Sequence, residues 1–156
     1  MPNITPFLWF DNNAEEAMNF YASIFKDSEV VSVMRHREGG MGSQGAVFSA
    51  TFRLQGQEFI ALNGGPHFRF TPAISLFVTC DSQEEVDELW DKLCAGGEPN
   101  RCGWLTDKYG LSWQIVPAGL PQLMTDADAA ATDRVMNAVL KMKKFDLAAL
   151  QRAFAG

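Results

Sequence analysis

The side chain with the clearest potential for chemistry is the carboxamide of Gln114. It lies in the stretch Trp104–Pro117 (W-L-T-D-K-Y-G-L-S-W-Q-I-V-P), which is typical of two short strands joined by a turn at Asp107 and Gly110. Apolar side chains alternate along the second strand: Leu111, Trp113 and Ile115. The alternation places Gln114 on the opposite face, away from the core. An uncharged amide both donates and accepts hydrogen bonds, so it suits a neutral polar ligand better than a metal ion.

Other candidate bases and nucleophiles are few. His36 and His67 are the only histidines, and His67, in N-G-G-P-H-F, lies at a pocket mouth or in solvent. Cys102, in C-G-W, is a candidate nucleophile, although no base is identifiable beside it and cysteine is commonly a small buried hydrophobe. Cys80, Cys94 and Cys102 show no C-x-x-C spacing. This fits a reduced cytosolic protein better than a disulfide or zinc framework.

Composition limits the class of protein and its partners. The 156 residues are 47% hydrophobic and 21% charged, which indicates one globular domain or two small modules that share a core. The net charge is −6 without a basic face, and this argues against a nucleic-acid partner. The apolar runs are too short to span a membrane and no signal peptide is recognisable. We therefore expect a cytoplasmic protein.

The elements that must position these side chains form a repeat. The first half shows the order β-α-β-β-β: a strand at 4–10, a helix from 14 with possible caps at 11–13, strands at 28–36 and 46–54 around a glycine-rich loop, and a strand at 57–62. The second half begins with a strand at 73–80 and a helix at 83–94, capped by Asp81 or Ser82, followed by strands at 99–105 and 111–116. Glu15-Glu16 before Phe20-Tyr21 matches Glu84-Glu85 before Leu89-Trp90, which supports the repeat.

After Pro117 the pattern becomes helical. Apolar spacing predicts a helix at 126–142 and a last helix capped by Asp146. This tail lies outside the repeat, and we expect it to cover an exposed face or the edge of a partner.

Four sequence pieces resemble the vicinal oxygen chelate superfamily, which includes glyoxalase I, bleomycin-resistance proteins and extradiol dioxygenases. They are I-T-P-F-L-W-F-D, A-E-E-A-M-N-F-Y, F-I-A-L-N-G-G-P and C-G-W-L-T-D-K-Y-G-L-S-W-Q-I-V-P. They are similar to the PhnB-like branch, labelled "3-demethylubiquinone-9 3-methyltransferase domain", over nearly the whole chain including the tail. The resemblance implies an α+β fold of tandem βαβββ modules, with curved mixed sheets around a cavity. We expect module one at 1–66, module two at 67–118 and C-terminal helices at 119–156.

The same resemblance bears on metal binding. Metal-dependent members hold a divalent ion with His or Glu side chains on the first and last strands of the modules. Here those positions fall on Thr5, Ile60, Ser75 and Gln114. None supplies an imidazole or a carboxylate, and a shift of one residue is no better. We therefore expect no metal and no cofactor.

Two principal functions remain open. The first is a small-molecule binding protein, or a metal-independent enzyme, with a neutral or aromatic ligand in its cavity. The candidate pocket residues are Phe7, Trp9, Asn63, His67, Phe77, Cys102, Trp104 and Gln114. The second is methyl transfer to a demethylubiquinone-like quinol, as the family label implies, although no glycine-rich turn for S-adenosylmethionine is recognisable. A metal-dependent lyase or dioxygenase is a third alternative. The superfamily resemblance, open sheet edges and the apolar tail also predict a homodimer.

Overall fold

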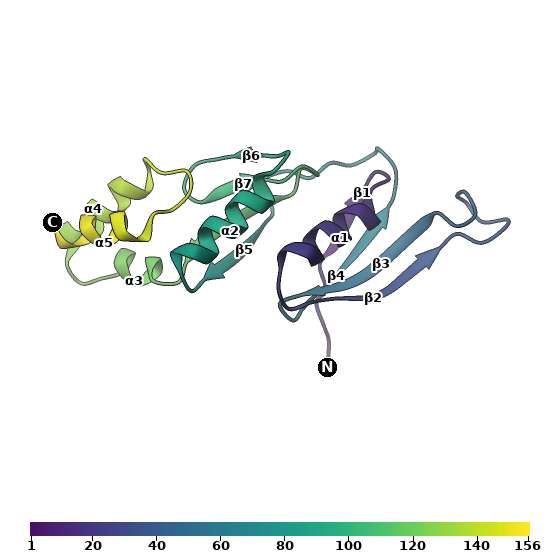
Figure 1. Cartoon of the computed structure of the whole chain (residues 1–156), viewed down its shortest axis with the longest axis horizontal. Coiled ribbons are helices and arrows are strands. Elements are labelled where there is room, and N and C mark those ends of the chain that lie inside the picture. The colour runs from purple at the N-terminus through teal and green to yellow at the C-terminus, as the bar shows by residue number, and fades with distance from the viewer. The chain divides into compact units, whose positions relative to one another are not determined.

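The computed structural model describes all residues from 1 to 156, and its contacts divide the chain into two compact units, 1–70 and 71–156 (Figure 1). Each unit contains one βαβββ module, as predicted, and its four strands form an open mixed sheet. The elements of the first unit are β1 (Phe7–Phe10), α1 (Ala14–Ile24), β2 (Ser28–Arg35), β3 (Val47–Leu54) and β4 (Gln57–Asn63). Those of the second are β5 (Ser75–Cys80), α2 (Gln83–Cys94), β6 (Glu98–Pro99), β7 (Trp104–Thr106), β8 (Ser112–Pro117), α3 (Leu120–Met124), α4 (Ala129–Val139) and α5 (Leu147–Ala155).

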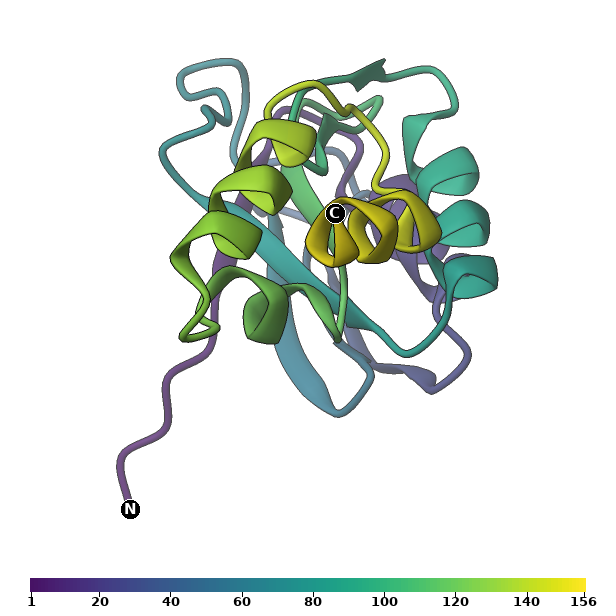
Figure 2. The same cartoon turned by 90° about the vertical axis from the view of Figure 1, so that its left-hand side faces the viewer.

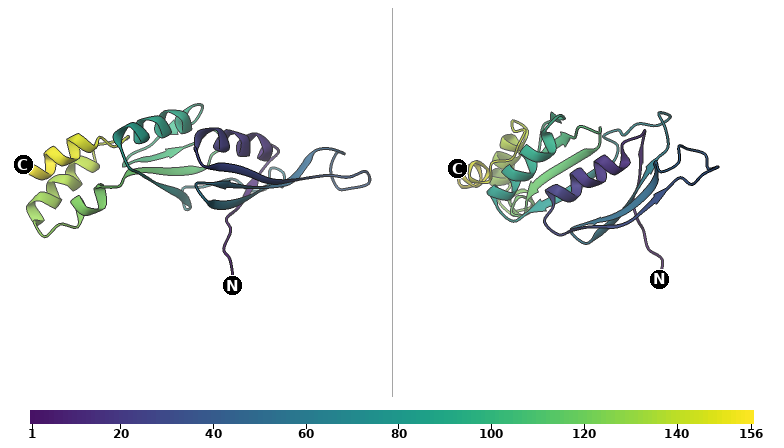
Figure 3. Two further views of the ribbon diagram at one scale, coloured as in Figure 1. Left: turned by 60° about the horizontal axis from the view of Figure 1, so that its bottom comes forward. Right: turned by 45° about the vertical axis from the view of Figure 1, so that its right-hand side comes forward.

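The first sheet has the strand order β1-β4-β3-β2, with β1 parallel to β4 and the other pairs antiparallel. Helix α1 packs across one face of this sheet (Figure 3). Leu8 and Phe10 alternate with Phe7 and Trp9, so only the first pair is buried. Phe52 and Phe59 stack beneath the helix. A two-residue turn at Gln55 and Gly56, both with positive φ, joins β3 to β4; this backbone matches the twist of a tight hairpin.

The second sheet repeats this topology, with the order β5-β8-β7-β6 and a parallel β5–β8 pair. Helix α2 covers one face and buries Val86, Trp90 and Leu93. Its bounds match the prediction, and Ser82 is the cap because its side chain accepts a hydrogen bond from the Glu85 amide. In β8, Trp113 and Ile115 are buried core residues, as predicted. On the opposite face Ser112 and Val116 are buried too, so Gln114 is the one partly exposed residue of the strand.

Several strand and helix limits were wrong. The strand expected at 4–10 begins only at Phe7. The strand expected at 99–105 is divided into β6 and β7 because Cys102 and Gly103 both have positive φ and form a turn. The helix expected at 126–142 is shorter, since Asp128 caps α4 and the helix ends at Val139. Helix α3, which begins with Leu120 and Pro121, was missed.

The tail forms a small apolar core of its own on the second unit. The helices α3, α4 and α5 lie together, as Figure 2 shows. The buried members of this tail cluster are Val116, Leu120, Val135, Val139, Phe145 and Leu150. Because Val116 belongs to β8, the tail is anchored on the sheet itself. None of the helices has the length and apolar character needed to cross a membrane.

Candidate functional site

A row of three side chains crosses the second sheet on the face opposite α2, which we call the open face. Phe77 on β5 faces Gln114 on β8, and Gln114 faces Trp104 on β7. Three neighbouring strands therefore bring together three of the predicted pocket residues. Phe77 is 57% exposed, while Gln114 and Trp104 are half-buried. Because residues in register lie close enough for their side chains to interact, the row forms a continuous surface of two aromatic rings around one amide.

The amide of Gln114 is oriented by Ser75, the first residue of β5. Gln114 Nε2 donates to Ser75 Oγ over 3.0 Å. This bond holds the carboxamide of Gln114 beside Ser75 and leaves its Oε1 free. Ser75 was identified in the sequence only as a position without a metal ligand, and its pairing with Gln114 was missed. The alternation of β5, which places Ser75, Phe77 and Thr79 on one face, is the signal that could have revealed it.

A buried carboxylate holds the β7–β8 hairpin that carries Trp104 and Gln114. Asp107 is only 2% exposed. Its Oδ1 accepts hydrogen bonds from the amides of Tyr109 and Leu111, at 2.8 and 3.1 Å, and its Oδ2 accepts from Trp113 Nε1 at 2.9 Å. Gly110 completes the turn with a positive φ. Both turn residues expected at this hairpin thus occupy it, and Asp107 supports the strand beside the open face.

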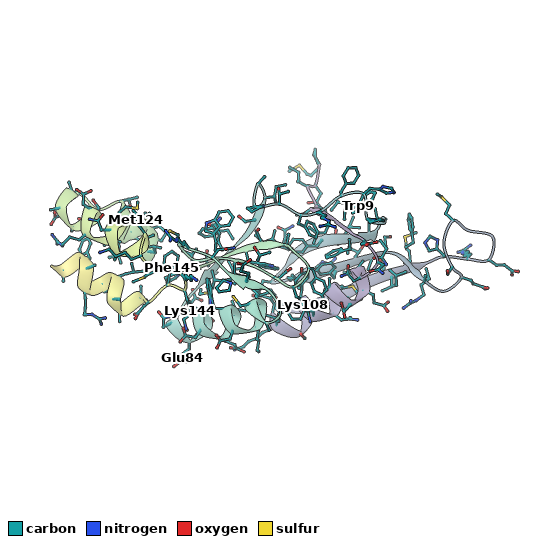
Figure 4. All side chains as sticks on the ribbon, turned by 90° about the horizontal axis from the view of Figure 1, so that it is seen from above. Trp9, Glu84, Lys108, Met124, Lys144 and Phe145 are labelled. Atoms are coloured by element: carbon teal, nitrogen blue, oxygen red, sulfur yellow. The ribbon has the colours of Figure 1, made fainter.

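The corresponding face of the first sheet carries a second aromatic group. Phe7, which is 57% exposed, faces Ile60, and Trp9 faces Leu62. Trp9 lies on the side of its sheet away from α1 (Figure 4). Its Nε1 donates to Gly65 O at 2.9 Å, and Phe68 packs edge-on at a centroid distance of 4.9 Å. Trp9 is therefore held in place by the segment after β4.

The other three predicted pocket residues have different surroundings. Asn63 supports the start of α1, because its Oδ1 accepts a hydrogen bond from the Ala14 amide at 2.8 Å. The N-cap residue is Asn13, but its side chain makes no capping hydrogen bond. His67 is exposed in the connection after β4. Cys102 packs against the tail cluster, where its Sγ donates to Val139 O at 3.6 Å. None of the three joins the row formed by Phe77, Gln114 and Trp104.

The structure also bears on the four positions at which the superfamily resemblance implies metal ligands. Phe7 faces Ile60 in the first sheet as Phe77 faces Gln114 in the second, so Ile60 and Gln114 are structurally equivalent. Ser75 and Gln114 are bonded to each other, and Thr5 precedes β1. No three His, Cys, Asp or Glu side chains are grouped as a metal site needs. The donor set, two hydroxyls, an amide and an alkyl group, does not fit a transition metal.

Two units of the βαβββ type, each with one helix on one face of an open mixed sheet, define the glyoxalase-type fold of the vicinal oxygen chelate superfamily. The family model for 3-demethylubiquinone-9 3-methyltransferase matches residues 2–116. The chain belongs to this family, the PhnB-like branch of the superfamily. The match ends at β8, so the expected resemblance of the tail is not supported. Among curated proteins, none matches the chain.

Solved structures agree with this assignment. A PhnB protein from Bacillus cereus, described as a putative 3-demethylubiquinone-9 3-methyltransferase, is 46% identical, with a TM-score of 0.70, over 75% of this chain and 100% of that protein. A Pseudomonas aeruginosa protein is 19% identical with a TM-score of 0.62, over 75% of this chain and 98% of that one. The fosfomycin resistance protein FosX from Listeria monocytogenes is 18% identical with a TM-score of 0.56, over 80% of this chain and 98% of that one. The last two show similarity of fold alone.

Proposed function

We propose that this protein binds a small, uncharged, planar molecule on the open face of its second sheet, and that any turnover there is metal-independent. The observation that carries the proposal is the row of Phe77, Gln114 and Trp104 on adjacent strands. Aromatic side chains supply apolar contact area, and a single oriented amide supplies a direction for hydrogen bonding. A few polar groups among aromatic ones are typical of small-molecule sites.

The spacing of the row suits a flat ring. Neighbouring strands lie about 4.8 Å apart, so Phe77 and Trp104, on either side of β8, are attached about 10 Å apart. A ring sandwiched between two others needs about 3.5 Å on each face, or about 7 Å between the outer rings. A small inward lean of both side chains would give that spacing. A ligand ring standing above Gln114 would then present its edge, with a carbonyl or hydroxyl group, to the amide.

The polarity of the face favours an uncharged ligand. The side chains that alternate onto it are Ser75, Phe77, Thr79, Trp104, Thr106, Ser112, Gln114 and Val116. None of these is ionisable at neutral pH, whereas the edge strand β6 adds the exposed carboxylate of Glu98, opposite Thr106. The hydroxyl of Ser75 can donate as well as accept, so Gln114 can offer either its oxygen or its nitrogen to the ligand. Quinones, phenols and amides match these groups. The Mn(II) and phosphonate named with the Listeria FosX structure would need charged partners, and the row of Phe77, Gln114 and Trp104 supplies none.

Methyl transfer is the second candidate, because the family model carries that label. S-adenosylmethionine usually lies on a glycine-rich turn between a strand and a helix. Three turns of this chain lead from a strand into a helix. Asp11-Asn12-Asn13 and Asp81-Ser82 contain no glycine, and Ala118-Gly119, before the short helix α3, contains a single one, so none is glycine-rich. We therefore propose that S-adenosylmethionine does not bind specifically. Calorimetry with this cofactor tests the point: saturable binding tighter than about 100 μM, or roughly −5.5 kcal/mol, would favour the methyltransferase.

The binding proposal is tested with a panel of uncharged methyl-substituted hydroquinones and phenols, followed through tryptophan fluorescence. Trp104 should be quenched by a ring that stacks on it, whereas the buried Trp90 and Trp113 should respond little. For the probe that binds, Gln114→Leu should weaken affinity by about 1–3 kcal/mol, the cost of an unpaired buried polar group on the ligand. Gln57→Leu, at an exposed glutamine of β4, is the matched control. Equal affinities of both variants and the wild type would remove Gln114 from the site.

We also propose that the protein is cytoplasmic. Its three cysteines are all free thiols in the structure, which fits a reducing compartment.

A further inference from the structure

The tail is bonded to the turn that leads into β7. The amide of Cys102 donates to Met142 O and the amide of Gly103 donates to Lys143 O, both at 2.8 Å. These two carbonyls follow α4 in the chain. Buried backbone amides are almost always paired, and the partners of these two belong to the tail. Trp104 is the next residue after Gly103, so the tail is one residue away from the aromatic wall of the open face.

The turn has a backbone that needs such support. Cys102 has φ +57°, a region that residues with a Cβ occupy at a cost. Such a conformation persists where surrounding contacts enforce it. Gly103, with φ +79°, lies directly against the Phe145 ring, where an added methyl group would collide with it. Phe145 itself is buried in the tail cluster. The turn therefore keeps its shape because the tail is docked on it.

Two further contacts hold the tail on the second unit. The amide of Gln83, at the start of α2, donates to Phe145 O at 2.8 Å and accepts from the Leu147 amide at 2.7 Å. Lys144 forms an ion pair with Asp87 at 2.9 Å. Phe145 and Lys144 lie where the tail meets the rest of the unit, and Glu84 lies farther out on α2 (Figure 4).

The tail also contacts β8, the strand that carries Gln114. Val116 is two residues after Gln114 on the same strand and points to the same face. It is buried in the tail cluster rather than exposed. The tail thus contacts both strands that carry the site: β7 through the Cys102–Gly103 turn and β8 through Val116.

We propose that the tail is a positioning element that sets the placement of Trp104 relative to Gln114 and so tunes ligand affinity on the open face. The inference about affinity rests on the proposed function, whereas the placement of Trp104 does not depend on any ligand. The tail lies beyond the part of the chain that matches the family model. It therefore gives this protein a means of adjusting a site whose other parts belong to the family domain.

The test uses Phe145→Ala in the full chain, which removes the ring against Gly103 while it leaves every side chain of the open face in place. Protein labelled with 5-fluorotryptophan gives one ¹⁹F signal for each of the four tryptophans, and Trp104→Phe identifies the signal of Trp104. Amide hydrogen exchange reports on Cys102 and Gly103. The second variant is Gln83→Ala, which removes two hydrogen bonds to the tail and leaves the side chains of the tail cluster unchanged. Glu84→Ala, at the neighbouring exposed residue of α2, is the matched control.

We expect Phe145→Ala to shift the Trp104 signal and to lower the protection of the Cys102 and Gly103 amides by about tenfold or more, with a smaller change in Gln83→Ala and none in Glu84→Ala. The fluorine signal of Trp113 should stay in place. Should Phe145→Ala not fold, Gln83→Ala decides with the same readouts. An unchanged Trp104 signal in the folded variant overturns the inference. A shifted signal with no binding of methylhydroquinone to the wild type would instead count against the proposed function.

Discussion

The stability of the second unit should depend strongly on Asp107. Its carboxylate is buried and accepts from two backbone amides and from Trp113 Nε1. Two of these donors, the Leu111 amide and the indole, are themselves buried. In Asp107→Ala both lose this acceptor, and each buried donor left unpaired costs about 1–3 kcal/mol. The Tyr109 amide is partly solvated and adds little. We expect a loss of about 3–4 kcal/mol in the free energy of unfolding.

Urea-induced unfolding, followed by far-ultraviolet circular dichroism, measures this loss. Asp107→Asn keeps one carbonyl oxygen but turns an NH₂ group toward a donor, so it should cost less, about 1–2 kcal/mol. Asp133→Ala, at an exposed acidic residue of α4, should stay within about 0.5 kcal/mol of wild type. A loss below about 1 kcal/mol for Asp107→Ala would show that water replaces the carboxylate easily. The hairpin would then not be held in the way we describe.

Four further predictions concern other properties of the chain. Burial, with added repulsion from Glu85 and Asp81, raises the pKa of Cys80 from 9.0 to about 11. At pH 8 its thiolate should therefore be about 100-fold scarcer than that of an ordinary thiol, and a disulfide reagent should label it slowly. The same shift favours the folded state below pH 9, and that stability should be lost as the pH rises through about 11, measured against Cys80→Ser. Elemental analysis of untagged protein should find no stoichiometric zinc, nickel or iron, and about one per chain would contradict the assignment of Gln114. Sedimentation at micromolar concentration should give a homodimer, and a 17.3 kDa species would exclude it.

The repeat was predictable because its signals are local. Strand alternation, the acidic first turns of both helices and the hairpin glycines Gly56 and Gly110 are encoded within a few positions. The positions whose structure was not predicted from the sequence depend on distant partners. Cys102 adopts a left-handed backbone because Met142, Lys143 and Phe145 hold it there, and nothing near Pro99 in the sequence indicates this. In the same way, Asn63 supports α1 from 49 positions away, which no capping pattern in the segment before the helix could reveal.

The candidate site was predictable in part for the same reason. The face of Gln114 followed from alternation, and the β7–β8 and β5–β8 registers then placed Trp104 and Phe77 beside it. The bond to Ser75 depends on a strand 39 positions away, so the sequence alone could not assign it. Cys102 was grouped with these residues because it is close to Trp104 in sequence. Its side chain packs against the tail cluster instead, because Cys102 and Gly103 both have positive φ and turn the chain before Trp104.

The equivalence of Ile60 and Gln114 explains why we expect one oriented site rather than two. Both residues occupy the same place in their modules, opposite Phe7 and Phe77. An alkyl side chain at Ile60 provides contact area but no direction, because dispersion and burial act without a preferred axis. The amide at Gln114 provides direction, and it is the one that Ser75 holds in place. A ligand on the first sheet alone could rotate freely, whereas one that bonds to Gln114 has a fixed edge. We therefore expect the second module to determine which molecule is recognised.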